Sequence, residues 1–499
     1  MTVSRHAWIV LAIVAFLSVF AVCMRPRRLF ADPTTDQTPK TIAVIGAGLG
    51  GLTVAYRLQQ AGYNVDVYEA RNRPGGRVYT YHADDGSYEE FGGTTLLDGD
   101  SSALRSLIEE CGLTTVVKTG PIAPWIAKDD GSYEDLAEVA SLGEPTEVGG
   151  LLKEQAGAAA TMSAMPSIDE FIQTAAHGND ACVAVLRALW RSTQGDPVNS
   201  TGIAWPALHA SYTKVWSVAE QLRKKLVPVY SFEYIKGGND QLVYRLAEPL
   251  KGHTHYKSPV TGVQVDYNGS VVISYRDPER SEEKTASYGC VVCAVPCTLL
   301  REGGIRFSFV GFPQQEAASI TERFATIAQQ PYAAVIKMLF RVQAEVSSVE
   351  GNELNSARTT HTVALPYFYS LMPAGELWPN VDGSLLTYYI TKPLSKGDGT
   401  AFTPEDYAQQ IQERFPFLDE VTCVGSVDWA NEPYSLGTWR YAGRAPLTDY
   451  DVDALYQPIA NKLFFAGEHT DRSSGNMASA VRSGERVAKE IQALFPGAA

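Results

Sequence analysis

A glycine-rich segment at residues 46–51 constrains the fold of this 499-residue chain more than any other feature. The apolar residues 41–45 before it predict a short buried strand, and residues 52–61 after it predict a helix that Gly62 ends. A second short strand follows at residues 65–68. This order of strand, glycine-rich turn, helix and strand is typical of a βαβ unit that binds a dinucleotide.

The glycines of this segment have the spacing G-x-G-x-x-G, and each has a separate physical role. Gly46 permits the tight turn, Gly48 lets a pyrophosphate approach the backbone, and Gly51 lets the helix pack closely on the strand. The amides at the start of the helix favour the phosphates. Glu69, which ends the second strand, can accept hydrogen bonds from a ribose diol. The sequence therefore predicts a dinucleotide site.

A second glycine-containing loop follows Glu69 directly. Residues 71–77 read RNRPGGR, so that two glycines, the second of them Gly76, stand between Arg71 and Arg77. Such a loop suits a ligand whose phosphates are held from two sides, because the backbone can approach closely and the arginines supply positive charge. The alternative interpretation is a surface turn with solvated arginines.

These two loops resemble the N-terminal signature of the flavin-dependent amine oxidases, a family of monoamine, polyamine and L-amino-acid oxidases. Further blocks resemble the same family; they are YIKGG at residues 234–238, PVT at 259–261, FAGEHT at 465–470 and GNMASAVRSGER at 475–486. The resemblance spans essentially residues 41–495. It implies FAD rather than NAD as the cofactor.

The expected fold is α/β, with a Rossmann-like FAD-binding domain interleaved with an α+β substrate domain of mixed sheet and helices. The segments predicted for the FAD-binding domain are 41–100, 231–305 and 426–499. Those predicted for the substrate domain are 101–230, with much helix, and 306–425. Residues 1–40 form a separate N-terminal apolar segment and linker.

Residues near the C-terminus are expected to contact the cofactor. A strand at residues 462–465 ends at Gly467, and a helix starts near Met477. The N-terminus of that helix can stabilise negative charge on the N1–C2=O side of a reduced flavin. The resemblance implies that Glu468 binds the ribityl chain, that the Met477 backbone meets the flavin, and that the Val260 backbone contacts the adenine. It also implies that Gly93 and Thr94 lie at the cofactor.

One lysine stands out in the apolar strand predicted over residues 333–341. Alternation places Lys337 on the same face as Val335 and Leu339, and a lysine there is costly without partners. One interpretation is a lysine at the strand edge that reaches solvent. The resemblance implies the other, a catalytic lysine that holds a water at flavin N5. Burial should lower its pKa.

The segment 428–439 resembles the block that supplies one wall of the amine cage. Trp439 falls at the position of a cage aromatic, where its face can attract a cationic amine; the alternative is a core tryptophan. Asn476 stands where monoamine oxidases place the second cage tyrosine. Thr438 stands where they carry the cysteine bonded to the flavin, so FAD is expected to be non-covalent. Thr95 stands where L-amino-acid oxidases have an arginine for the substrate carboxylate, which favours an amine.

The expected activity is oxidation of a primary or secondary amine to an imine, with oxygen as the electron acceptor and hydrogen peroxide as the product. Three alternatives stay open at this point. They are an L-amino-acid oxidase, a flavin desaturase that acts on another substrate class, and a non-catalytic flavoprotein.

Charge and the N-terminal segment bear on partners. The formal charge of −14 argues against a nucleic-acid partner. Residues 7–24 form an uncharged apolar run that is just long enough to span a membrane. Because three arginines follow the run, we expect a membrane anchor; the alternative is export with residues 1–31 as a cleaved signal. No metal is expected, since Cys290, Cys293 and Cys297 lie in a buried-strand pattern without a nearby histidine.

Overall fold

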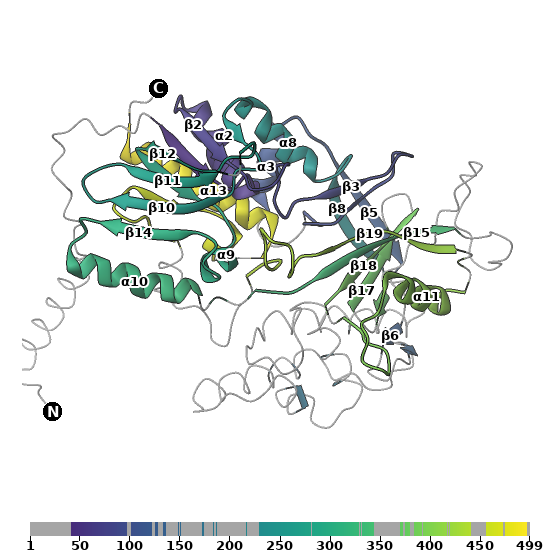
Figure 1. Cartoon of the computed structure of the whole chain (residues 1–499). Coiled ribbons are helices and arrows are strands. Elements are labelled where there is room, and N and C mark those ends of the chain that lie inside the picture. Colours follow the sequence, from purple (N-terminus) through teal and green to yellow (C-terminus); the bar gives the residue numbers. More distant parts are fainter. Residues whose placement is uncertain are drawn as a thin grey trace, which may run out of the picture. The chain divides into compact units, whose positions relative to one another are not determined.

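The computed structural model describes the chain between residues 41 and 496, with gaps (Figure 1). The described residues are 41–96, 101–121, 125–127, 133–135, 148, 150, 172–173, 183, 186, 216, 229–280, 282–328, 330, 332–343, 370–372, 375–379, 384–391, 393–416, 418, 420–440, 456–472 and 475–496. The expected N-terminal segment 1–40 lies outside them. Within residues 136–228, which belong to the part of the chain expected to contain much helix, the structure describes residues 148, 150, 172–173, 183, 186 and 216, and these are helical.

A parallel five-stranded sheet has the order β20-β13-β1-β2-β9. Its strands are β1 (Ile42–Ile45), β2 (Val65–Tyr68), β9 (Thr254–His255), β13 (Cys290–Cys293) and β20 (Leu463–Phe465). Strands β20, β13 and β1 are buried along their whole length, as their continuous apolar sequences predict. Segments from three distant parts of the chain therefore meet in one sheet.

Helices cover one face of this sheet. They are α2 (Leu49–Gln60), α3 (Ser102–Glu110), α8 (Asp240–Ala247) with the short helix η1 (Glu248–Leu250), and α13 (Met477–Leu494). Their apolar sides share one core cluster with alternate residues of β1 and β13, including Ile42, Val44 and Cys290. Helices α2 and α13 pack on each other, so the glycine motif and the C-terminal block lie side by side.

A second sheet, with the order β12-β11-β10-β14, lies against the other face. Its strands are β10 (Val260–Asp266), β11 (Val271–Arg276), β12 (Glu283–Tyr288) and β14 (Arg306–Val310). Helix α9 (Cys297–Arg301) follows β13, and α10 (Gln314–Ala328) packs Phe324 on Phe307 and Phe309 of β14 (Figure 1). Because β14 pairs with β10, this sheet continues past the boundary that we predicted at residue 305.

A third, antiparallel sheet has the order β16-β17-β18-β15-β19. Its strands are β15 (Ile336–Gln343), β16 (Ser370–Met372), β17 (Gly375–Pro379), β18 (Leu385–Ile390) and β19 (Glu420–Asp428). Helix α11 (Pro404–Arg414) shares a core cluster with one face of the sheet. The start of this helix is fixed by Pro404 in its first turn and by a capping box, in which the N-cap Thr403 and Asp406 bond to each other's backbone amides. The other face of the sheet carries Lys337.

Three two-stranded ribbons and a short helix complete the described elements. They are β3 (Thr80–His82) with β4 (Tyr88–Glu90), β5 (Thr115–Pro121) with β8 (Val229–Ile235), β6 (Trp125–Ala127) with β7 (Tyr133–Asp135), and η2 (Glu468–Thr470). The fold is thus α/β with mixed sheets and helices, as expected. Helix α2 begins at Leu49 rather than at residue 52, and its first turn includes Gly50 and Gly51.

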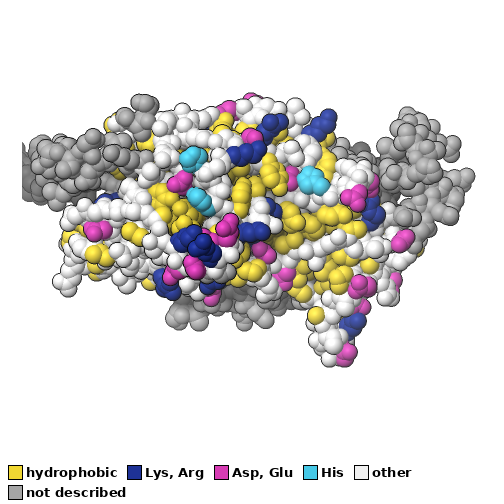
Figure 2. All heavy atoms as spheres, turned by 45° about the horizontal axis from the view of Figure 1, so that its top comes forward, with side chains coloured by type: hydrophobic (Ala, Val, Ile, Leu, Met, Phe, Trp, Pro, Cys, Tyr) yellow, Lys and Arg dark blue, Asp and Glu magenta, His cyan; other side chains and the backbone are white. Residues whose placement is uncertain are grey.

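Two of the cysteines that the sequence singled out are core residues of the parallel sheet. Cys290 and Cys293 belong to core clusters on opposite sides of the parallel sheet, as alternation predicts, and burial raises the pKa of both thiols to about 12. Among the described residues, no group of three potential ligands could hold a metal ion, and no helix is long and apolar enough to cross a membrane. On the face shown in Figure 2, acidic and basic side chains lie interspersed around hydrophobic ones.

Candidate active site

The glycine motif has the backbone geometry that its sequence predicts. Gly46 adopts φ +100° in the turn between β1 and α2. A Cβ on Gly51 would lie 2.1 Å from the Gly46 carbonyl oxygen, so helix and strand pack too closely for any side chain there. A Cβ on Gly48, in contrast, would meet nothing within 4 Å. Gly48 is therefore an open position at the start of α2, whereas Gly51 is a packing position.

The second glycine loop lies directly on the first. The Gly75 amide donates to the Ala47 carbonyl at 2.7 Å, and a Cβ on Gly76 would lie 3.4 Å from the Gly48 Cα. The first turn of α2 contains no acidic residue that could occupy its free amides. Two loops with little side-chain bulk and one helix N-terminus thus converge, which is the geometry expected for a clamped pyrophosphate.

Glu69 lies at the carboxyl end of β2, beside this turn. Its carboxylate accepts hydrogen bonds from the Ala47 amide at 2.7 Å and from the Arg71 amide at 2.8 Å. Burial raises the pKa of Glu69, and these two backbone donors oppose the rise. Val260, at the start of β10, is also buried close to this strand, since the neighbouring Ser258 amide donates to the Glu69 carbonyl at 2.8 Å. The position fits a carboxylate that binds a ribose.

Arg71 has a partner that the sequence did not indicate. Its guanidinium forms an ion pair with Glu432 at 2.8 Å and donates to the Ser435 hydroxyl at 3.0 Å. Arg71 therefore ties the second glycine loop to the segment that carries Trp439. The cofactor-binding role that the sequence predicts for Arg71 stays a prediction, and no local signal could reveal a partner 361 residues away.

Arg77 and Glu468 form a buried centre between the same two parts. The Arg77 guanidinium donates to Glu468 at 3.1 Å and to the Thr438 carbonyl. Glu468 also accepts from the Tyr332 hydroxyl at 2.6 Å and from the Gly475 amide at 3.2 Å. Burial alone would raise the pKa of Glu468, but Arg77 and the hydrogen bonds lower it overall. Sequence reasoning missed Tyr332, which is an isolated aromatic residue outside any motif.

The turn before Glu468 and the loop that contains Gly93 bring further predicted residues together. Gly467 adopts φ +123°, a backbone conformation that favours glycine. A Cβ on Gly93 would lie 3.0 Å from Met477 Cγ, so this loop lies at the start of α13. Asn239, which follows the YIKGG block, donates to the carbonyls of Gly93 at 2.9 Å and Thr94 at 2.7 Å. Sequence blocks that resemble the family are therefore neighbours in space.

Lys337 is buried, so it does not reach solvent from a strand edge. Its ammonium group donates to the carbonyl of Glu90 at 3.1 Å, to the carbonyl of Gly92 at 2.6 Å and to the Thr94 hydroxyl. Burial lowers the pKa of Lys337 to about 8, although Glu89 and Glu90 oppose that shift. The lysine thus holds the loop of Gly92 and Thr94 through an ammonium group that can lose its proton near neutral pH.

Trp439 and Asn476 have different environments. Trp439 is partly buried and stacks on Tyr389, with ring centroids 6.2 Å apart and planes 13° apart. Asn476 is the N-cap of α13, and its side-chain oxygen accepts from the Ser479 amide at 2.8 Å. This contact directs the Asn476 oxygen toward the helix. The Thr438 hydroxyl donates to the Ala333 carbonyl at 2.7 Å, and a threonine offers no sulfur for a flavin bond.

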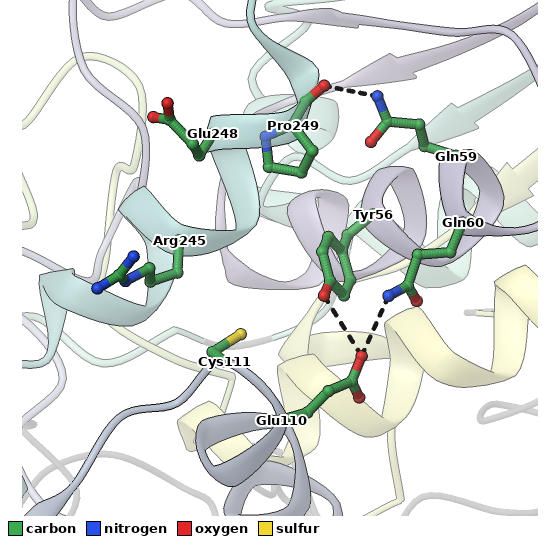
Figure 3. A pocket seen from close by; sticks show the side chains of 8 residues that line it. All are labelled: Tyr56, Gln59, Gln60, Glu110, Cys111, Arg245, Glu248 and Pro249. Carbon is green, nitrogen blue, oxygen red and sulfur yellow. Dashed lines mark hydrogen bonds between the residues drawn. The ribbon is translucent and has the colours of Figure 1, made fainter.

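An open pocket near the C-terminal end of α2 is separate from these residues (Figure 3). It is lined by Tyr56, Gln59, Gln60, Glu110, Cys111, Arg245, Glu248 and Pro249. Tyr56 lies about two turns along α2 from Gly48, or roughly 12 Å. Gln60 and Tyr56 both donate to Glu110 across the pocket, at 3.2 Å and 3.4 Å. The pocket contains none of the predicted cofactor residues.

The residues around the glycine loops fit FAD. The open Gly48 and the unblocked amides of α2 suit a diphosphate, and the buried Glu69 carboxylate suits a ribose. The N-terminus of α13, with Met477 against Gly93, would hold the ring system, because helix amides favour the negative charge of a reduced flavin. The candidate site thus has separate positions for the two ends of the cofactor.

Known proteins similar to this chain include oxidases of amines and amino acids. L-amino-acid oxidase of Gloydius blomhoffii is 22% identical over 482 residues, which cover 91% of this chain and 89% of that protein. Lysine-specific histone demethylase 1 homolog 2 of Arabidopsis thaliana is 24% identical, over 93% of this chain and 60% of that protein. Two solved structures share the fold. Cyclohexylamine oxidase from Brevibacterium oxydans has a TM-score of 0.64 at 18% identity and covers 92% of this chain and 100% of its own. Putrescine oxidase bound to putrescine has a TM-score of 0.61 at 20% identity and covers 91% and 99%.

The sequence pattern of one family, described as flavin containing amine oxidoreductase, matches residues 49–492. This match begins in the glycine motif and ends in α13, so it includes both ends of the candidate site. The cofactor is FAD, bound without a covalent link. The chain therefore belongs to the flavin-containing amine oxidoreductase family.

Proposed function

We propose that the protein oxidises a primary or secondary amine to an imine and passes the electrons to oxygen, which yields hydrogen peroxide. One observation carries the proposal. The buried Lys337 ammonium is held at the loop of Gly92 and Thr94 and lies 5.8 Å from the centre of the Tyr389 ring, which stacks on Trp439. A proton-exchanging group and an aromatic wall therefore lie together beside the expected flavin position.

Three groups of the protein have separate roles in this reaction. When bound, FAD accepts a hydride equivalent from the carbon next to the amine nitrogen and gives the electrons to oxygen. The aromatic face of Trp439 holds the amine, which must be neutral to react. The amides at the start of α13 favour negative charge near Met477. Lys337, whose pKa burial lowers to about 8, can hold a water molecule or exchange a proton near neutral pH.

An amine is favoured over an amino acid as the substrate. Thr95 occupies the position at which L-amino-acid oxidases carry an arginine for the carboxylate, and threonine cannot form that bidentate pair. The similarity to an L-amino-acid oxidase of Gloydius blomhoffii supports the second candidate, oxidation of an L-amino acid. Both candidates use the same flavin chemistry and differ in how the substrate is held.

Anaerobic reduction of the flavin separates the two candidates. Residues 41–499, purified with FAD and a flavin spectrum, are mixed without oxygen with a panel of amines and a panel of L-amino acids. Bleaching of the flavin absorption by amines, followed by hydrogen peroxide when oxygen is admitted, is the expected result. Bleaching by amino acids alone supports the second candidate, and bleaching by neither class would sink both. A Lys337→Met variant that keeps the full reduction and reoxidation rates would show that the lysine has a structural role only.

A further inference from the structure

Two adjacent tyrosines of β18 lie on opposite faces of the third sheet. Tyr388 is fully buried, stacks edge-on against Tyr407 of α11 at 5.4 Å, and its hydroxyl donates to Gln410 at 2.8 Å. Tyr389 points to the other face, as strand alternation requires, and is the one residue of β18 that is not fully buried. The strand thus places one tyrosine in the core and one toward the candidate site.

Tyr389 is the direct cross-strand neighbour of Lys337. The register of β15 and β18 pairs these two residues, so their side chains share one face. The lysine Nζ lies 5.8 Å from the Tyr389 ring centroid and 5.7 Å from that of Trp378. The rings of Tyr389 and Trp378 are themselves 5.8 Å apart. An aromatic surface therefore surrounds the ammonium group on this face.

The same ring faces the wall predicted from the sequence. Tyr389 and Trp439 lie almost parallel, 13° apart, with their centroids at 6.2 Å. They come from separate elements, because Trp439 follows β19 and Tyr389 lies in β18. Asn476, where a second cage aromatic was expected by resemblance, contributes its side-chain oxygen to the cap of α13. The second aromatic group beside Trp439 is thus supplied by the sheet and not by the helix.

We propose that Tyr389 is a substrate-binding residue and that the aromatic surface of Trp439, Tyr389 and Trp378 selects monoamines with an apolar ring or chain next to the reacting carbon. This inference rests on the proposed amine oxidation. Three adjoining rings offer a large apolar contact for such a group.

Binding of an amine that cannot be oxidised tests the inference without turnover. α,α-Dimethylbenzylamine has no hydrogen on the carbon next to nitrogen, so it can bind but not reduce the flavin. Its Kd is measured from the perturbation of the flavin spectrum and from the rise in Tm of the FAD-loaded protein. We expect Tyr389→Ala to weaken binding about tenfold and Tyr389→Phe to change it less than about twofold, because the ring and not the hydroxyl forms the surface.

Tyr388→Phe is the matched control, since it alters the neighbouring residue on the opposite face. It should leave the Kd unchanged, while loss of its hydrogen bond to Gln410 lowers Tm slightly. Tyr389→Leu, which keeps an apolar side chain, replaces Tyr389→Ala if the alanine variant does not fold. An unchanged Kd in a folded Tyr389 variant, or a wild-type protein that binds putrescine more tightly than benzylamine, overturns the inference.

Kinetics with benzylamine keep the two proposals apart. If the wild-type flavin is bleached, Tyr389→Ala should raise the apparent Kd for reduction more than it lowers the limiting rate, because the ring contacts the substrate and not the reacting bond. Normal bleaching with unchanged binding in the variant contradicts only the role of Tyr389. A flavin that no amine bleaches contradicts the proposed function, whatever the analogue binding shows.

Discussion

The nucleotide loops and the lysine face of the third sheet form their sites in opposite ways. In the loops, function depends on side chains that are absent, because a Cβ on Gly51 would lie 2.1 Å from a carbonyl oxygen and Gly76 adopts φ +56°, which favours glycine. On the sheet, regular strands present side chains, as the pairing of Lys337 with Tyr389 shows. A substitution in the loops should therefore act through the backbone, whereas one on the sheet should change chemistry and leave the fold in place.

Gly51→Ala should have the largest effect. The added methyl group would collide with the Gly46 carbonyl oxygen at 2.1 Å, and neither the strand nor the helix can move without disturbing the parallel sheet. We expect a loss of about 3 kcal/mol or more in the free energy of unfolding, and no retained FAD. Thermal unfolding of the apoprotein, together with the flavin content after purification, measures both effects.

Gly48→Ala is the matched control three residues away. Its Cβ would meet no atom within 4 Å, and φ of −71° suits any residue. The apoprotein should unfold at the wild-type temperature, while FAD affinity falls about tenfold because the methyl group occupies the place of the pyrophosphate. Equal losses of stability in the two variants would contradict the distinction between an open and a packed glycine.

Lys337→Met should have an intermediate effect, and its signature is the dependence on pH. Burial disfavours the charged ammonium, so the native protein holds this proton only up to about pH 8, whereas the unfolded chain holds it to about 10.5. The cost of burying the charge is complete below pH 8 and disappears as pH rises to 10.5. The unfolding free energy of the wild type, relative to that of the variant, should therefore increase over this range by on the order of 3 kcal/mol.

Urea unfolding of both apoproteins at pH 7, 8, 9 and 10 gives this difference. Titrations of distant groups cancel in the comparison, since the two proteins share them, whereas the nearby Glu89 and Glu90 interact with Lys337 and titrate differently in the variant. A difference in unfolding free energy that stays constant from pH 7 to 10 would mean that the pKa of Lys337 is not lowered in the native state. The lysine would then keep its charge throughout, and its proposed proton exchange near neutral pH would fail.

Local patterns predicted the nucleotide side better than the sheet face. The turn at Gly46, the close contact at Gly51 and the place of Glu69 depend on residues within one βαβ unit, so the spacing alone indicated them. Strand alternation likewise placed Lys337 on the face that it shares with Leu339, whereas its place at the flavin was implied only by the family resemblance. Tyr389 was not foreseen, because its role depends on a cross-strand register and on a ring from another segment. Such pairings are set by tertiary packing, which periodicity within one strand does not record.

Glu432→Gln should have the smallest effect and tests the link between the two regions. The pair of Arg71 and Glu432 is partly exposed, with 11% and 31% of the side chains accessible, and joins the second glycine loop to the segment of Trp439. A double-mutant cycle with Arg71→Met should give a coupling of about 1 kcal/mol in unfolding free energy. FAD affinity should stay within about twofold in Glu432→Gln, because the arginine keeps its positive charge. If this variant instead loses FAD to the same extent as Arg71→Met, the ion pair positions the arginine for the cofactor. The nucleotide loops then depend on a side chain from the segment that carries Trp439.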